Sequence, residues 1–256
     1  GVAVVLNSRA GEAMEQGLSC LAPFGRFIEL GKRDFVSNTA IGLRPMRNNI
    51  SYFGVDADQL LLHRPDVADK IMKNIAEGFE AGGHNGREET TTFTLIPMVR
   101  REIEVPLLAA GGIASGRGML AAMALGADGV QVGSRFVAST ESSAHANFKE
   151  KVLMTQDGDT HLTLKELTPV RLIKNSFYKK VQELYDKNAS KEELSALLGR
   201  ARAKLGMFEG DLEEGELEIG QVAGLIDAIK PASEIVSDLM KEFKEAQSQL
   251  CSIPEF

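Results

Sequence analysis

The stretch "AAGGIASGRGMLAAMALGADGVQVGSRF" at residues 109–136 decides the fold that we expect for this chain. It contains two short apolar runs of the kind that form buried β-strands, and each run ends in a glycine turn. The segment between the two runs has helical spacing. A repeated order of strand, glycine-rich loop and helix predicts a parallel α/β sheet, in which ligands bind at the carboxyl ends of the strands.

The two glycine turns have the chemistry of a phosphate site. Because glycine has no Cβ, successive backbone N–H groups in such a turn are open to an anion, and a helix that begins just after the turn adds a positive dipole end. We expect Gly111 and Gly112 to supply one set of N–H groups. Gly133 and Ser134 would supply the other, with the Ser134 hydroxyl as an extra donor. Glycine-rich turns also occur for packing alone, and the pattern leaves that alternative open.

The composition of the 256 residues indicates an acidic globular protein. A formal charge of -7, with no Lys/Arg stripe between aromatic residues, argues against nucleic-acid binding. Cys20 and Cys251 are far apart and outside any CxxC pattern, so we expect neither a disulfide framework nor a metal site. No apolar run reaches the roughly 18 residues of a membrane span, and the first residues lack the pattern of a signal peptide. A cytoplasmic protein without membrane contact is expected.

The residues before the opening stretch extend the α/β pattern. A helix is expected over residues 11–22 and a turn at residues 23–25, which gives a βαβ unit and favours a parallel sheet. A helical pattern covers residues 56–80, and a further strand near residues 76–79 would overlap its end. The clearer strands are expected at residues 2–7, 26–30, 50–55, 105–110 and 129–133.

Several motifs from about residue 77 to residue 221 resemble, in order and spacing, the C-terminal half of a family of FMN-dependent TIM-barrel proteins. This family contains the nitronate monooxygenases, also called 2-nitropropane dioxygenases, and the FMN-dependent enoyl-acyl-carrier-protein reductases. The motifs are "EGFEAGGHNG", "VPLLAAGGIASGRGMLAAMALGADGVQVGSRF", "ESSAHANFKEKVL", "PVRLIKN" and "ELEIGQVAGLI".

The resemblance implies FMN as the cofactor and His84 as the catalytic base or substrate-orienting group. Independently, a histidine in a glycine loop can approach a ligand closely, and its pKa near neutrality suits proton abstraction from carbon. An exposed loop histidine without a role is the alternative. His145 follows a sequence typical of a helix cap, so we expect a structural role for it. The residues implied to contact FMN are Gly82, Gly83, Gly111, Gly112, Gln131, Gly133 and Ser134.

Residues 1–75 resemble instead a part of the NADPH-dependent medium-chain enoyl reductases of polyketide synthases. The resemblance rests on "VVLNSRAGEAMEQGLSCLAPFGRFIELGKRD" and "IGLRPMRNNISYFGVDADQLL". In that family, residues like Lys32 and Asp56 have been considered proton donors. The GxGxxG phosphate fingerprint is absent upstream of the first strand, so a dinucleotide pyrophosphate has no helix N-terminus here. Without it, a solvated loop lysine is the favoured interpretation of Lys32.

Together these patterns predict a chimeric α/β chain with an open or incompletely closed parallel sheet. Residues 1–75 are expected to form a Rossmann-like fragment, residues 76–170 a partial TIM barrel, that is a (β/α) half-barrel, and residues 171–256 a helical subdomain. Helical periodicity prevails from Ser139 on, and the acidic loop at residues 208–221 is expected to be a solvated turn.

Three functions remain open from the sequence. The first is an FMN-dependent oxidoreductase that acts on a small nitronate or on an acyl thioester, with NAD(P)H as reductant in the second case and with Gln221 closing over the site. The second is an NADPH-dependent enoyl reductase fragment. The third is a folded chimera that binds phosphate or a nucleotide without turnover. An exposed apolar sheet edge favours self-association, so a homodimer is the assembly we consider.

Overall fold

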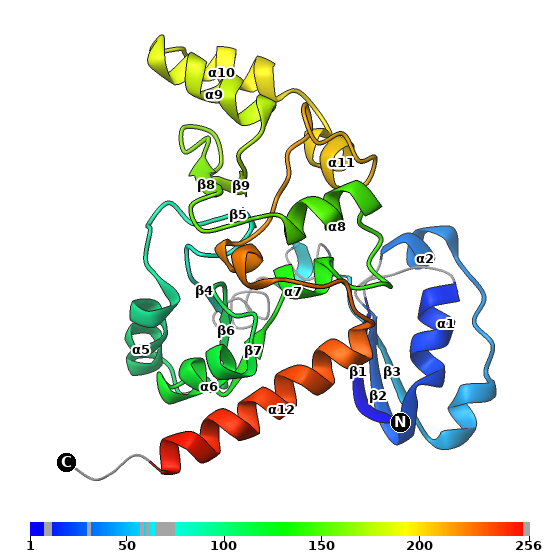
Figure 1. Ribbon diagram of the computed structural model, residues 1–256. Helices are drawn as coiled ribbons and strands as arrows, with labels where there is room; N and C mark the ends of the chain where they lie inside the picture. Colours follow the sequence, from blue (N-terminus) through cyan, green and yellow to red (C-terminus); the bar gives the residue numbers. More distant parts are fainter. Residues whose placement is uncertain (8–11, 30–31, 57–58, 60–61, 65–74, 253–256) are drawn as a thin grey trace. The chain divides into compact units, whose positions relative to one another are not determined.

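The computed structural model divides the chain into two compact units, Gly1–Met72 and Lys73–Phe256, and each is described by itself (Figure 1). Each unit contains a three-stranded parallel sheet together with helices, which confirms the α/β class. Among the described residues no sheet closes into a barrel. The structure describes all residues except 8–11, 30–31, 57–58, 60–61, 65–74 and 253–256.

The first unit is built on a parallel sheet of strand order β1-β2-β3. Its core contains the buried side chains of Met14, Leu18 and Phe27, and the Phe27 ring stacks on Tyr52 with 5.5 Å between ring centroids. Burial of these apolar side chains gives this small sheet most of its stabilisation. The elements are β1 (Val2–Asn7), α1 (Glu12–Ser19), β2 (Leu21–Glu29), α2 (Lys32–Ser37), η1 (Arg44–Asn48) and β3 (Ser51–Gly54).

Strand β2 is longer than the sequence pattern predicts. The helix expected to reach residue 22 ends at Ser19, and the expected turn at residues 23–25 lies inside the strand. The register with β1 passes from Val2↔Leu21 to Val4↔Arg26, so the extra residues form a bulge. The physical reason is burial of Leu21 in the core, which starts the strand before the proline.

The second unit contains the parallel sheet expected from the opening stretch, of order β4-β6-β7. Its core includes the fully buried Ile96, Leu107 and Ala109, with helix side chains packed against them. The elements are β4 (Ile75–Glu77), α5 (Thr92–Glu102), β6 (Leu108–Ala110), α6 (Gly116–Ala124), β7 (Gly129–Gln131) and α7 (Ser134–Val137).

The end of the helix expected over residues 56–80 is wrong, because residues 75–77 form β4. Most of that helix lies outside the described residues, and the strand suggested near residues 76–79 is present one residue earlier. Pairing of Ile75 with Leu108 and of Ala76 with Ala109 buries Ala76 in the core. Tertiary pairing therefore overrides the helical periodicity at this end.

An antiparallel sheet of order β5-β9-β8 was missed by the helical interpretation of the chain beyond Ser139. Val170, Leu172 and Ile173 are all buried in β9, whereas the helical pattern takes effect only at Ser176, after Asn175 caps the next helix by accepting a hydrogen bond from the Tyr178 N–H. A four-residue apolar strand carries no periodicity that distinguishes it from helix. The strands are β5 (Gly83–His84), β8 (Thr160–Thr163) and β9 (Val170–Ile173).

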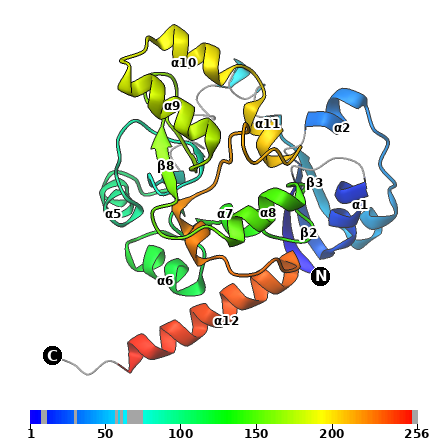
Figure 2. The same ribbon diagram turned by 45° about the horizontal axis from the view of Figure 1, so that its top comes forward.

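Helices form most of the remaining C-terminal part, as expected. Helix α12 runs alongside α6, and Arg117 donates a hydrogen bond to Gln249 across this contact (Figure 2). None of the described helices is both long and apolar enough to cross a membrane. The helices are α8 (Ala146–Leu153), α9 (Ser176–Asp186), α10 (Lys191–Leu198), α11 (Arg202–Met207), η2 (Gln221–Leu225) and α12 (Ala232–Cys251).

Candidate functional site

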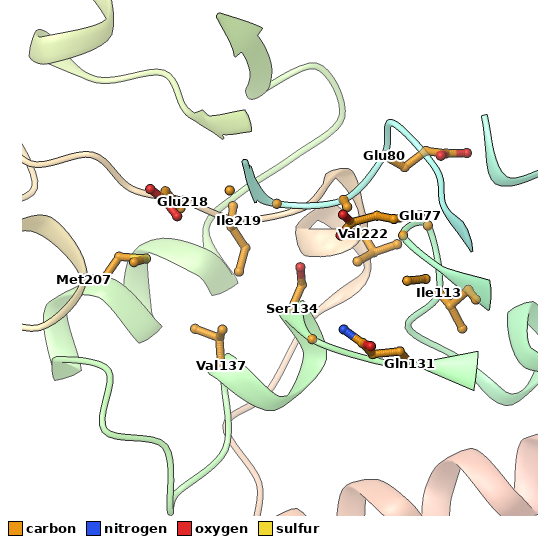
Figure 3. Close-up of a pocket in the computed structure, with 17 residues that line it drawn as sticks. Glu77, Glu80, Ile113, Gln131, Ser134, Val137, Met207, Glu218, Ile219 and Val222 are labelled. Atoms are coloured by element: carbon orange, nitrogen blue, oxygen red, sulfur yellow. The ribbon is translucent and has the colours of Figure 1, made fainter. Parts of the chain in front are cut away.

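A cavity of about 250 Å³ lies in the second unit, where the strands β4, β6 and β7 end (Figure 3). In Figure 3, Glu218 and Met207 stand at one end of this cavity and Ile113 at the other, with the Ser134 side chain between them. The structure brings together here all the residues that the sequence implied as cofactor contacts. These residues are Gly82, Gly83, Gly111, Gly112, Gln131, Gly133 and Ser134.

The glycine turn after β6 needs its glycines. Gly111 and Gly112 have φ angles of 82° and 69°, in the left-handed region that side chains rarely adopt. A Cβ atom on Gly111 would also lie 2.6 Å from the Gly78 carbonyl oxygen. Within the described part of the chain, the N–H groups of Gly111, Gly112 and Gly133 donate no hydrogen bond. Three residues that line one cavity therefore have N–H groups available to an anion.

The first turn of α6 is already occupied by protein acceptors. The Glu242 carboxylate accepts a hydrogen bond of 2.8 Å from the Gly116 N–H, and the Ser115 hydroxyl oxygen accepts one of 3.1 Å from Gly118. Glu242 also places a negative charge at the positive end of the helix. An anion in the cavity would therefore be held by the glycine N–H groups rather than by the dipole of α6.

The loop between β4 and β5 is held against the segment before η2. A Cβ atom on Gly82 would lie 2.3 Å from the Gly220 nitrogen, so the two backbones are in direct contact. The Gly220 N–H donates to the Ser134 hydroxyl oxygen at 3.0 Å, and the Gln221 N–H donates to the Glu80 carbonyl at 2.9 Å. Gln221 thus reaches the site through its backbone, while its side chain is exposed and does not line the cavity.

His84 lies beside the cavity without lining it. Gly83, its neighbour in β5, lines the cavity, whereas the His84 side chain is exposed. The charge of His84 lowers the pKa of Glu218, which opposes the larger effect of burial on that carboxyl. An exposed imidazole next to a cavity-lining carboxyl can exchange protons with a bound molecule and with solvent.

Sequence reasoning missed the carboxyl groups of the site. Glu77, Glu80 and Glu218 line the cavity, and burial raises the pKa of both Glu77 and Glu218. The Glu80 carboxylate accepts a hydrogen bond of 3.0 Å from the Thr92 N–H and one of 3.1 Å from the Thr92 hydroxyl. These three glutamates make the glycine-lined cavity acidic.

The expectation of a solvated acidic turn at residues 208–221 is wrong at its C-terminal end. Glu213 is exposed, but Glu216 is buried, and Leu217 and Ile219 pack in a core cluster. Alternation of acidic and apolar residues in "ELEI" was the available signal, since it is typical of an extended segment with one buried face. Burial, together with the charge of Glu218, raises the pKa of Glu216 from 4.5 to about 7.

Replacing Glu216 with glutamine is expected to flatten the pH dependence of stability. Because the folded chain binds the Glu216 proton more tightly than the unfolded chain, stability should fall as the pH rises from 4.5 to about 7. At pH 8, after allowance for solvent screening, Glu216→Gln should be more stable than the parent by about 1–2 kcal/mol. Urea unfolding at pH 5 and pH 8 measures this difference, and an equal effect of the substitution at both pH values would contradict it.

Arg171 is a second residue that sequence reasoning missed. Its side chain is almost fully buried, its Nε donates a hydrogen bond of 3.1 Å to the Phe79 carbonyl, and its guanidinium lies 4.8 Å from the centroid of the Phe79 ring. Burial lowers its pKa. Arg171 of β9 therefore holds in place the loop that contains Phe79, Gly82 and Gly83.

The other residues singled out from the sequence do not line this cavity. His145 caps α8, its Nδ1 accepting a hydrogen bond of 3.1 Å from the Asn147 N–H, so its structural role is confirmed. In the first unit Asp56 is half-buried, and the Lys32 side chain lies outside the described part. Among the described residues, no group of three or more His, Cys, Asp or Glu side chains could hold a metal.

Comparison with known proteins agrees with the motifs around the cavity. The chain is 33% identical over 186 residues to a probable nitronate monooxygenase of Staphylococcus saprophyticus, which covers 68% of the chain and 52% of the relative. The structure of FabK from Thermotoga maritima is 34% identical and superposes with a TM-score of 0.66, covering 96% of this chain and 76% of that one.

A separate, shorter similarity links the chain to a polyketide synthase. Polyketide synthase 37 of Dictyostelium discoideum is 49% identical over 72 residues, which is 28% of this chain and 2% of that protein. The chain spans about half the length of the curated nitronate monooxygenases that it matches. The family model described as nitronate monooxygenase matches residues 66–242, which include the whole cavity. On this match, and on the glycine turns it contains, the chain belongs to the nitronate monooxygenase family.

Proposed function

We propose that the cavity binds the phosphate end of FMN and that the chain acts as an FMN-dependent oxidoreductase. One observation carries this proposal: Gly111, Gly112 and Gly133 line the same cavity, and among the described residues their N–H groups donate no backbone hydrogen bond. Ser134 adds a hydroxyl group that already accepts one hydrogen bond and can donate its proton to a phosphate oxygen. The match to the nitronate monooxygenase family supports a flavin as the ligand.

The cavity fits the phosphate end better than a whole cofactor. Its volume of about 250 Å³ is below the roughly 300–1,000 Å³ usual for complete ligand sites. Gly111, Gly112 and Gly133 have no side chains that would fill the space a phosphate needs. A Cβ atom on Gly133 would meet no neighbouring atom, and Gly111 and Gly112 have positive φ angles. Gly82, Gly83 and Gln131 would then lie at the edge of the flavin. When bound, FMN would supply hydride and electron transfer.

His84 is proposed as the acid–base group of the reaction. Its imidazole is exposed beside the cavity and can take a proton from a carbon acid or orient a substrate carbonyl or nitro group. The substrate would be a small nitro compound or an acyl thioester, with NAD(P)H reducing the flavin in the second case. A homodimer and a cytoplasmic location stay predictions, and light scattering of the purified chain measures the first.

An NADPH-dependent enoyl reductase activity is a second candidate. It is favoured by the 49% identity to polyketide synthase 37 over 72 residues. The parallel sheet β1-β2-β3 is compatible with a part of a nucleotide-binding domain. In this case NADPH fluorescence should respond to the chain, and FMN should not be retained.

An absorbance scan of the purified chain from about 300 to 550 nm tests the proposed function. The spectrum is recorded before and after addition of FMN and removal of the excess. Flavin bands that remain with the protein support the FMN site. A colourless protein with no retained FMN contradicts it, and phosphate binding without turnover would point to the non-catalytic chimera.

Ser134→Ala is expected to raise the Kd for FMN by about tenfold, because one hydrogen bond to a charged phosphate is lost. Quenching of flavin fluorescence during titration measures the Kd. Ser134→Thr, which keeps the hydroxyl, should bind within about threefold of the parent. Ser195→Ala, on the exposed face of α10, is the matched control and should leave the Kd unchanged. If the Ser134→Ala and Ser195→Ala chains bind FMN with equal Kd, Ser134 does not contribute to FMN binding.

A further inference from the structure

Glu218 is placed beside Gly83 by backbone pairing with β9. The Ile173 N–H donates a hydrogen bond of 2.9 Å to the Leu217 carbonyl, and Leu172 forms an isolated β-bridge with Glu218. Because β8 pairs with the other edge of β9, Glu218 follows β5 along the same edge. The result is a close approach, since a Cβ atom on Gly83 would lie 2.9 Å from Glu218 Oε2.

The Glu218 carboxyl is open to a ligand in the cavity. It lines the cavity at the end where Met207 and Ile219 contribute apolar side chains (Figure 3). Within the described residues no donor forms a hydrogen bond with this carboxyl, and no Lys or Arg side chain lines the cavity. The Glu218 oxygens are not among the fully buried polar atoms without a partner, so they stay accessible from the cavity. The charge of His84 lowers the pKa of this carboxyl, and the charge of Glu218 in turn raises the pKa of Glu216.

We propose that Glu218 is a second proton-exchanging residue of the cavity, acting beside His84 on carbon-acid substrates, a proposal that rests on the proposed function. The Glu218 carboxylate takes a proton from a carbon next to an electron-withdrawing group. The C–H bond breaks, an O–H bond forms on the carboxyl, and the electron pair stays on the substrate, delocalised into that group. The proton returns to carbon in the reverse direction or leaves to solvent through His84.

The electrostatics of the site fit this role. Burial raises the pKa of Glu218, and a more basic carboxylate accepts a proton from carbon more readily. The neighbouring charge of His84 lowers the same pKa and so opposes the larger effect of burial. Glu216 is buried two residues before it, and the charge of Glu218 adds to burial in raising the pKa of Glu216. Glu218 therefore has access to the cavity, and burial and the charge of His84 act in opposite directions on its pKa.

Deuterium exchange at the α-carbon of nitroethane tests the proposal without any redox turnover. The full chain as purified is incubated with nitroethane in D2O, and loss of the α-proton signal is followed by NMR. The parent chain should exceed the buffer rate, and Glu218→Gln should lower the excess rate at least about tenfold. Glu213→Gln, an exposed residue of the same acidic segment, should keep the parent rate.

Two outcomes overturn the role of Glu218: a parent chain no faster than buffer, or equal rates for the parent and Glu218→Gln. Because exchange requires no flavin, loss of FMN binding would contradict the proposed function while leaving this result interpretable. If Glu218→Gln alters the circular dichroism spectrum, carbon-13 titration of Glu218 in a His84→Asn chain replaces it. The Glu218 midpoint should then move up, because a lowering charge is lost, and an unchanged midpoint overturns the pairing.

Discussion

A Gly112→Asp chain is expected to emerge colourless from purification and to bind FMN at least ~100-fold more weakly than the parent. Gly112 has a φ angle of 69°, so any side chain there is strained. A Cβ atom would lie 3.4 Å from the Glu80 carboxyl carbon, which places the new carboxylate next to an existing one and in the path of a phosphate. Like charges at such distances strongly disfavour an anionic ligand.

Gly112→Ala separates the charge from the strain. It introduces the same Cβ atom without the carboxylate, so it should weaken FMN binding by less than Gly112→Asp. Both chains are compared with the parent by titration with FMN and by far-ultraviolet circular dichroism. A folded Gly112→Asp chain that still retains FMN would mean that the turn after β6 does not hold the phosphate.

Phe148→Ala is expected to lower the free energy of unfolding by about 3–5 kcal/mol. Phe148 in α8 is fully buried in a cluster with Ile173, Leu217 and Ile219. Truncation leaves a cavity among side chains that belong to different elements and cannot all collapse into it. Ile219 also lines the ligand cavity, so the site and the core share this cluster.

Urea unfolding followed by circular dichroism measures the effect of Phe148→Ala. Phe93→Ala is the matched control, because this phenylalanine of α5 is 71% exposed. The control should change stability by no more than about 0.5 kcal/mol. A loss for Phe148→Ala as small as that for Phe93→Ala would show that the cluster does not contribute to the measured transition.

The glycine turns are the part of the site that sequence predicts best. Gly111, Gly112 and Gly133 follow apolar strands, and the carboxyl ends of neighbouring parallel strands meet at one edge of a sheet. Local pattern and chain order therefore suffice to bring these residues together. His84 follows from the same reasoning only in part, since its neighbour Gly83 lines the cavity and its own side chain does not.

The acidic side of the site could not be predicted in this way. Glu216 and Glu218 belong to a run of charges that local reasoning assigns to solvent. Glu216 is buried and Glu218 is half-buried because Leu217 and Ile219 enter a distant core. Likewise, Glu242 belongs to α12, more than a hundred residues later in the sequence, and accepts a hydrogen bond from the first turn of α6. Such contacts depend on which distant segments pack together, and no local period encodes that choice.

By itself, the sequence determined the α/β class, the parallel strands with their glycine turns, and the glycines that meet at one cavity. Only the tertiary structure decided that β5, β9 and β8 form an antiparallel sheet and that Glu218 stands beside Gly83. The physical reason is that the propensities of short segments are weak, and long-range burial and hydrogen bonding select among them.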